Sequence, residues 1–282
     1  MKYWQVLILL FIVALSLRTA RCFIVDRISK DGVLYVKMAE SVALGEKELS
    51  FVENRRMPPL YIQFIAVLHR FGISFESGGR VISVLAGSLL VIPFFLVVRL
   101  FFGDRAAFIS GLLVVVHPSL VKVSSTVMRD SLFLSLMVFS FSFIVFAIHK
   151  RRYFYWGTAG FFAALASATR AEGVELILAV LLWMSVSLIR YYMVRKSEKN
   201  CLCIEEGGDE PAVSKGDCFS FTHTVAGPMI FILLFFVVSF PISESVRGTS
   251  STWSVIDSRI IGYARNLLSH SSEEALKRED TL

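Results

Sequence analysis

The residues best suited to chemistry in this chain are a few charged side chains that adjoin long apolar segments. Asp31 stands just before a segment with helical spacing. Arg129 and Asp130 precede one apolar run, and Arg170 and Glu172 follow another. Ionisable groups beside the hydrocarbon of a membrane are costly and often functional. If these groups face the same side of a membrane, they predict a site for a charged headgroup next to lipid.

Each of these residues also has a purely structural interpretation, and the sequence leaves both interpretations open. Asp is a favoured N-cap, so Asp31 and Asp130 could each cap the helix that follows. Arg170 and Glu172 could form an ordinary interfacial ion pair. His117, which precedes Pro118, is interpreted as a helix-end residue rather than as a metal ligand.

The composition is that of a membrane protein. The 282 residues are 55% hydrophobic and 18% charged, whereas a soluble domain carries about 25% charged residues. This excludes a disordered protein and argues against a soluble enzyme. The net charge of +6 is interpreted as loop charge that orients the chain, and no nucleic acid is expected as a partner.

The apolar segments predict an all-α polytopic membrane protein with about seven transmembrane helices, since each span needs about 20 mostly apolar residues. The candidates are residues 4–17, 81–98, 106–121, 131–148, 153–169, 174–189 and 225–242. The first is interpreted as an uncleaved anchor rather than a signal peptide, because Arg21 stands where a cleavage site needs a small residue. Two interfacial helices are expected in the following loop, over residues 33–43 and 59–71.

Basic residues in the short loops set the orientation, because Lys and Arg prefer the cytoplasm. With the N-terminus inside, the inner hairpins hold ten Lys and Arg residues and the short outer hairpins hold three. The protein is therefore expected in the cell membrane, in contact with membrane lipids, with its charged helix ends on the extracytoplasmic face.

This topology divides the chain into four parts. Residues 1–193 form a transmembrane catalytic module that includes the extracytoplasmic loop 18–80. Residues 194–224, with an acidic cluster and a Gly-Gly pair, are expected to be a flexible cytoplasmic loop. Residues 225–242 form the final span, and residues 243–282 form an extracytoplasmic tail.

The chain resembles the GT-C glycosyltransferases that use polyprenyl-phosphate-linked sugars, the protein O-mannosyltransferase and aminoarabinose transferase type. The resemblance covers about residues 1–189 and rests on ordered cues. These are an anchor helix; Asp31 with Tyr35, Ala39 and Gly45; Pro58-Pro59-Leu60-Tyr61; Pro118 and Ser124 with Arg129-Asp130-Ser131-Leu132-Phe133; and Thr169-Arg170-Ala171-Glu172-Gly173.

The resemblance implies that Asp31 is the catalytic base of an inverting transfer to an acceptor hydroxyl on a protein, lipid or glycan. Many relatives carry a second acidic residue directly after this Asp, where this chain has Gly32, so Asp31 would act alone or with Glu40. A carboxylate takes the proton of the attacking hydroxyl, and the lipid phosphate leaves with the help of cations.

Arg170 is the first candidate for binding the donor phosphate, because arginine binds phosphate oxygens bidentately. The wider set of expected substrate-binding residues comprises Glu172, Asp130, Tyr35, Lys122, Arg129, Arg55 and Arg56. No metal or other cofactor is assigned, and the lipid-linked sugar is a substrate.

Two other classes of protein stay open at this point. A transporter or flippase subunit would show polar residues in the middle of its spans and a repeat between halves, whereas the charges here stand at helix ends. A truncated, non-catalytic relative is the other alternative, because the resembled enzymes commonly have more spans.

Overall fold

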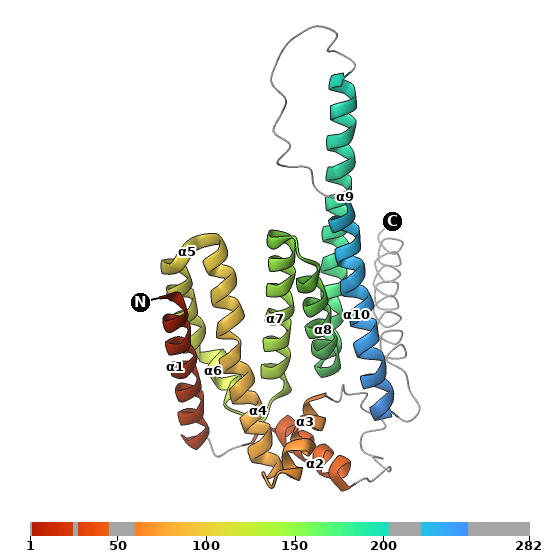
Figure 1. Cartoon of the computed structure of the whole chain (residues 1–282). Helices are drawn as coiled ribbons and strands as arrows, with labels where there is room; N and C mark the ends of the chain where they lie inside the picture. Colours follow the sequence, from red (N-terminus) through yellow and green to blue (C-terminus); the bar gives the residue numbers. More distant parts are fainter. Residues whose placement is uncertain (1, 25–27, 45–59, 203–220, 248–282) are drawn as a thin grey trace, which may run out of the picture.

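The computed structural model describes residues 2–24, 28–44, 60–202 and 221–247. All regular secondary structure in these ranges is helical, which confirms the predicted all-α class (Figure 1). The elements are α1 (Tyr3–Ile24), α2 (Lys30–Leu44), α3 (Leu60–Arg70), α4 (Phe75–Leu89), α5 (Val91–Val116), α6 (Pro118–Ser124), α7 (Arg129–Lys150), α8 (Tyr153–Thr169), the 3-10 helix η1 (Ala171–Val174), α9 (Glu175–Leu202) and α10 (Phe221–Arg247).

Four helical segments in the described ranges are long and apolar enough to cross a membrane. They are Tyr3–Ile24, Phe75–Val116, Arg129–Lys150 and Ala171–Met193, and Thr224–Ser239 is a shorter apolar segment. Their length and composition are those of transmembrane helices. The count of seven spans stays a prediction.

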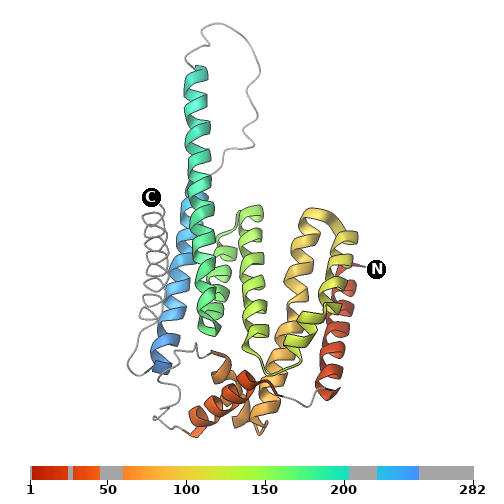
Figure 2. The same cartoon turned by 180° about the vertical axis from the view of Figure 1, so that it is seen from behind.

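The apolar stretch from α4 to α6 is interrupted at two residues, Gly103 and His117. The backbone of Gly103 has a φ of +80°, a conformation that glycine adopts without strain. The chain reverses direction within α5, so its two halves run side by side (Figures 1 and 2). The second break falls at His117, where ψ is 118°.

The break at His117 corrects the predicted span over residues 106–121, which is not one helix. α5 ends at Val116 and α6 starts at Pro118. The cause is the proline, because a residue that precedes proline is pushed out of the α region. His117 is thus a helix-end residue, which agrees with its structural interpretation.

The later helices follow the apolar pattern closely. The predicted segment 153–169 coincides with α8, and 131–148 lies inside α7. α9 continues to Leu202 and extends well past α7 and α8 (Figure 2), and α10 begins at Phe221. Helix therefore enters both ends of the predicted loop 194–224. The middle of that loop and residues 248–282 lie outside the described residues.

α8 packs closely between α7 and α10. Many of its buried residues are small, among them Ala159 and Ala163, and Trp156 is fully buried in the same core. The hydroxyl of Ser140 on α7 donates a hydrogen bond to the Ala159 carbonyl across 2.8 Å. Small residues let membrane helices approach closely, and a serine hydroxyl can join two such helices.

α1 packs on α5 through an apolar core and through one fully buried charged side chain, Arg18. Its guanidinium donates hydrogen bonds to the carbonyl of Ala14 at 3.1 Å and to those of Val114 and Val115 at 3.4 Å. The last carbonyls of a helix lack partners within it and carry partial negative charge. A buried cation at the end of α5 satisfies both conditions.

α2 and α3 lie together at one end of the helix bundle, beside the ends of α4 and α7 (Figure 1). Their buried apolar residues form one core with α4, α7 and α8; it includes Tyr35, Met38, Tyr61, Ile65, Val127 and Leu132. The two expected loop helices are therefore present. They cover the end of the bundle to which the charged helix ends also belong.

Candidate functional site

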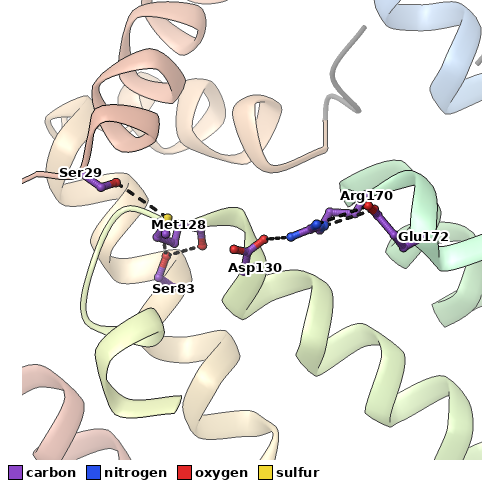
Figure 3. A network of polar contacts seen from close by, with 6 residues as sticks. All are labelled: Ser29, Ser83, Met128, Asp130, Arg170 and Glu172. Carbon is purple, nitrogen blue, oxygen red and sulfur yellow. Dashed lines mark hydrogen bonds and ion pairs between the residues drawn. The ribbon is translucent and has the colours of Figure 1, made fainter. Parts of the chain in front are cut away.

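Arg170 is the centre of a charged cluster between α7 and α8. It follows α8 in extended conformation, and its Nη1 donates a hydrogen bond to Oδ1 of Asp130 in the first turn of α7 (Figure 3). Its Nε and Nη2 donate to the two carboxylate oxygens of Glu172 at 3.2 Å and 3.3 Å. The structure thus brings together three residues that lie up to 42 positions apart in the sequence.

The two carboxylates hold Arg170 in its charged form. Its pKa is raised above the ordinary value, mainly by the hydrogen bond to Glu172 and further by Asp130, while partial burial acts in the opposite direction. A guanidinium that already donates to two carboxylates has its positive charge largely compensated. This limits the attraction it exerts on a further anion.

Neither aspartate of the site caps a helix, so the capping interpretation is wrong for both. The N–H of Gly32 donates to the hydroxyl of Ser29 at 3.0 Å, which makes Ser29 the cap of α2. Asp31 lies in the first turn of that helix. α7 begins after Met128 without any side-chain cap, and Asp130 in its first turn is paired with Arg170.

Asp31 is exposed and stands one helical turn before the buried Tyr35. Within the described residues its carboxylate has no hydrogen-bond or ion-pair partner. A carboxylate in the first turn of a helix is stabilised by the helix dipole and is available to an incoming group. Glu40, the other acid considered on α2, is also exposed.

Tyr35 lies close enough to the charged residues of the site for their charges to affect the pKa of its phenol. Burial raises the pKa of its phenol, and the charges of Arg129, Asp31, Asp130 and Arg170 shift it further in opposing directions. All four groups therefore act on one side chain. The ring of Tyr35 also lies 5.7 Å from the guanidinium carbon of Arg129, a cation–π contact.

Arg129 differs from Arg170 in having no carboxylate partner among the described residues. Its Nη1 is buried and lacks a hydrogen-bond partner there. A buried N–H group without a partner is rare and calls for an explanation, such as a bound anion. Within the described residues, Arg129 thus has a guanidinium without a carboxylate partner directly beside the Arg170 cluster.

The remaining expected site residues lie away from the cluster or outside the described ranges. Lys122 is exposed on α6, and no contact in the described part of the chain joins its side chain to Asp130 or Arg170. Arg55 and Arg56 lie outside the described residues. No group of three or more His, Cys, Asp or Glu side chains in the described ranges could hold a metal ion.

Two further residues beside the site were not predicted from the sequence. The hydroxyl of Ser83 on α4 contacts the backbone of Met128, next to Arg129 (Figure 3). The phenol oxygen of Tyr61 on α3 lies 3.0 Å from the Ser83 hydroxyl. Tyr61 belongs to the Pro-Pro-Leu-Tyr motif that contributed to the resemblance, so a signal existed for it. Ser83 is one of several serines in apolar helices and had none.

Comparison with known protein families gives a match. A family model described as dolichyl-phosphate-mannose-protein mannosyltransferase matches residues 56–202, slightly more than half of the chain. The matched part contains Arg129, Asp130, Arg170 and Glu172 and begins after Asp31. No curated protein and no solved structure matches the chain.

Proposed function

This chain belongs to the dolichyl-phosphate-mannose-protein mannosyltransferase family, and on this premise we propose that it transfers a sugar from a polyprenyl-phosphate donor to a hydroxyl group outside the cytoplasm. Family membership and the apolar helices make it an integral membrane glycosyltransferase of the mannosyltransferase kind. The donor, the acceptor and the roles of individual residues are the proposal.

Asp31 is proposed as the base. It accepts the proton of the acceptor hydroxyl while that oxygen attacks the anomeric carbon and the bond from that carbon to the phosphate oxygen breaks. The sugar inverts its configuration, and the lipid phosphate leaves with the bonding electrons. The observation that carries this role is the free, exposed state of Asp31, which caps no helix and pairs with no cation in the described ranges.

The donor phosphate is assigned first to Arg129, with Arg170 as a secondary ligand. Arg129 has a buried Nη1 without a partner, whereas Arg170 already donates to two carboxylates. An uncompensated guanidinium at the membrane edge stabilises the negative charge that develops on the leaving phosphate. Asp130 and Glu172 then serve to hold Arg170 rather than to bind the sugar directly.

The proposed topology keeps seven spans, with this site on the extracytoplasmic side. α2, α3, the start of α7 and the turn after α8 share one end of the bundle (Figure 1). The reversal within α5 and the α7–α8 connection, which contain Arg99, Arg105 and Arg151, lie at the other end. This separation agrees with a cytoplasmic location for the basic hairpins.

The decisive experiment measures sugar transfer in membranes that contain Asp31→Asn, Arg129→Gln or Asp104→Asn. Asp104 is the matched control, an exposed carboxylate beside Gly103 that pairs with Arg99. We expect Asp31→Asn to reduce transfer from a radiolabelled polyprenyl-phosphate mannose by about 100-fold or more. Arg129→Gln is expected to raise the KM for the donor, and the control to retain activity.

Undiminished transfer by Asp31→Asn would refute the assigned base. Equal loss in all three variants would point to a defect in insertion, so the amount of protein in the membrane is measured alongside. Movement of lipid or solute across the membrane without transfer of sugar would instead support a transporter or flippase.

A further inference from the structure

We propose that Ser83 is a positioning residue, which fixes the helix that carries Asp31 relative to the helix that carries Arg129 and Asp130. Ser83 and its partners Tyr61 and Met128 are called the Ser83 junction below. The inference rests on the proposed function for its kinetic consequence. Its structural consequence can be measured independently.

Ser83 is fully buried in α4 and contacts two other elements. Its hydroxyl donates to the carbonyl of Met128 at 3.1 Å and accepts from the N–H of Met128 at 3.4 Å (Figure 3). The phenol oxygen of Tyr61 lies 3.0 Å from the same hydroxyl, and Tyr61 also donates to the carbonyl of Gly79 at 2.9 Å. The Ser83 hydroxyl thereby joins α4 to the segment before α7. The Tyr61 hydroxyl, which contacts both Ser83 and the Gly79 carbonyl, joins α3 to α4 at the same place.

Met128 is the residue that directly precedes α7. It is the extended residue directly before Arg129, and no side chain caps the helix there. A second bond fixes the same place, since the hydroxyl of Ser131 donates to the carbonyl of Ser83 at 2.7 Å. The first turn of α7, with Arg129 and Asp130, is therefore attached to α4 at both of its ends.

The same segment supports the first turn of α2. A Cβ atom added to Gly32 would stand 2.9 Å from the carbonyl oxygen of Val127, so α2 lies directly on this backbone. The hydroxyl of Ser29 that caps α2 also lies 3.8 Å from the sulfur of Met128 (Figure 3). Asp31 stands between Ser29 and Gly32, and its position follows that of residues 127 and 128.

Tyr61 supports the second turn of α2. Its ring meets that of Tyr35 edge to face, with 5.7 Å between the centroids. Burial raises the pKa of Tyr61, which keeps its hydroxyl protonated as a donor. Two contacts of α2 thus lead to the Ser83 junction, one through Met128 and one through Tyr61.

Ser88 offers a matched control on the same helix. It is as fully buried as Ser83, but its hydroxyl donates to the carbonyl of Val84 at 2.8 Å within α4. Ser88→Ala removes a buried hydroxyl without breaking a link between helices. The difference between Ser83→Ala and Ser88→Ala therefore reports the junction alone.

The test combines hydrogen exchange with kinetics on the full chain in lipid nanodiscs. In Ser83→Ala we expect faster exchange of amides in residues 28–44 and 126–132, with other helices unchanged. We expect kcat to fall about 10- to 100-fold with little change in the donor KM. Misplaced catalytic groups slow the chemical step, whereas the contacts that bind the donor equally in the ground state and the transition state are kept. Ser88→Ala is expected to match the wild type in both measurements.

Equal exchange in Ser83→Ala and Ser88→Ala would overturn the inference even if the wild type transfers sugar. If exchange in α2 is faster in Ser83→Ala but not in Ser88→Ala, and the wild type transfers no sugar, the junction is supported and the proposed function is contradicted. If Ser83→Ala does not insert, Tyr61→Phe carries the test, since it removes the other hydroxyl of the junction and keeps the ring. Unchanged exchange of residues 28–44 in Tyr61→Phe would then count against the inference.

Discussion

Arg170 donates a hydrogen bond to Asp130 across 40 residues of sequence, and this contact closes the open end of the α7–α8 hairpin. The two helices are connected by a short turn at the opposite end (Figure 1). The ion pair thus joins them where the chain does not. The first turn of α7 is held from two directions, by this pair and by the Ser83 junction.

A double-mutant cycle should show a stabilising coupling between Arg170 and Asp130, and Arg170→Gln should lower the stability of the protein more than Asp130→Asn does. Arg170→Gln removes one guanidinium from beside both Asp130 and Glu172, whereas Asp130→Asn leaves Arg170 paired with Glu172. The side chains of Arg170 and Asp130 are 30% and 37% exposed, so we expect a coupling free energy of only about 1 kcal/mol. Thermal unfolding in detergent measures it, and strictly additive effects would contradict the pairing.

Gly32→Ala should disrupt the site although it is a minimal change. The added Cβ would stand 2.7 Å from a side-chain carbon of Ile28 and 2.9 Å from the Val127 carbonyl oxygen. Overpacking of this kind costs about 1–3 kcal/mol. We expect a lower unfolding temperature and reduced sugar transfer. Ser41→Ala, on the same helix, is the control and should change neither.

The same contact explains why this chain lacks an acidic residue after Asp31. No side chain is accommodated at position 32 without a shift of α2 away from Val127. A Gly32→Asp variant is therefore expected to lose activity rather than gain a second base. Increased transfer by that variant would show that α2 can move.

Tyr35→Phe should make the protein less sensitive to alkaline pH. Burial raises the pKa of Tyr35 in the folded state, while in the unfolded state it ionises near its ordinary value of about 10. Stability is therefore unaffected below that pH and falls above it, because only the unfolded chain ionises. The slope reaches at most about 1.4 kcal/mol per pH unit for one group.

Unfolding temperatures measured from pH 8 to pH 11 test this expectation. The wild type and Tyr35→Phe should diverge above about pH 10, with the variant losing less stability. Parallel curves for the two proteins would mean that the phenol of Tyr35 ionises as freely in the folded state as in the unfolded state.

The apolar pattern predicted helices well and side-chain partners poorly. α8 coincides with its predicted segment because hydrophobic residues mark its full length. The sequence left it open whether Asp31 caps α2, because Ser29 and Asp31 are both good caps and only the backbone geometry selects Ser29. The break at His117 was available from the following proline, but the apolar run continues past it.

For the candidate site too, the sequence predicted the positions of residues along the bundle but not their side-chain partners. That Asp130 and Arg170 share one end of the bundle follows from alternating spans, and their ion pair is consistent with it. Which arginine remains uncompensated does not follow, since Arg129 and Arg170 look equivalent in the sequence and differ only in their neighbours. Ser83 and Ser88 are likewise indistinguishable until their partners are known.

Arg18→Met should destabilise the attachment of α1. The substitution removes the donors to the carbonyls of Val114 and Val115, and a buried carbonyl without a partner costs about 1–3 kcal/mol. Arg21→Met is the control, because the Nε of Arg21 is buried without a hydrogen-bond partner in the described residues. The two unfolding temperatures should differ, and equal values would remove the role given to Arg18.

The Arg18 contact also sets an order of events during synthesis of the protein. The carbonyls that receive this arginine belong to residues translated 96 and 97 positions later. Until α5 enters the membrane, Arg18 has only the Ala14 carbonyl of its own helix as a partner, and its charge favours the aqueous boundary over the lipid interior. The first helix of the chain therefore takes its final place only after the middle of the chain has been made.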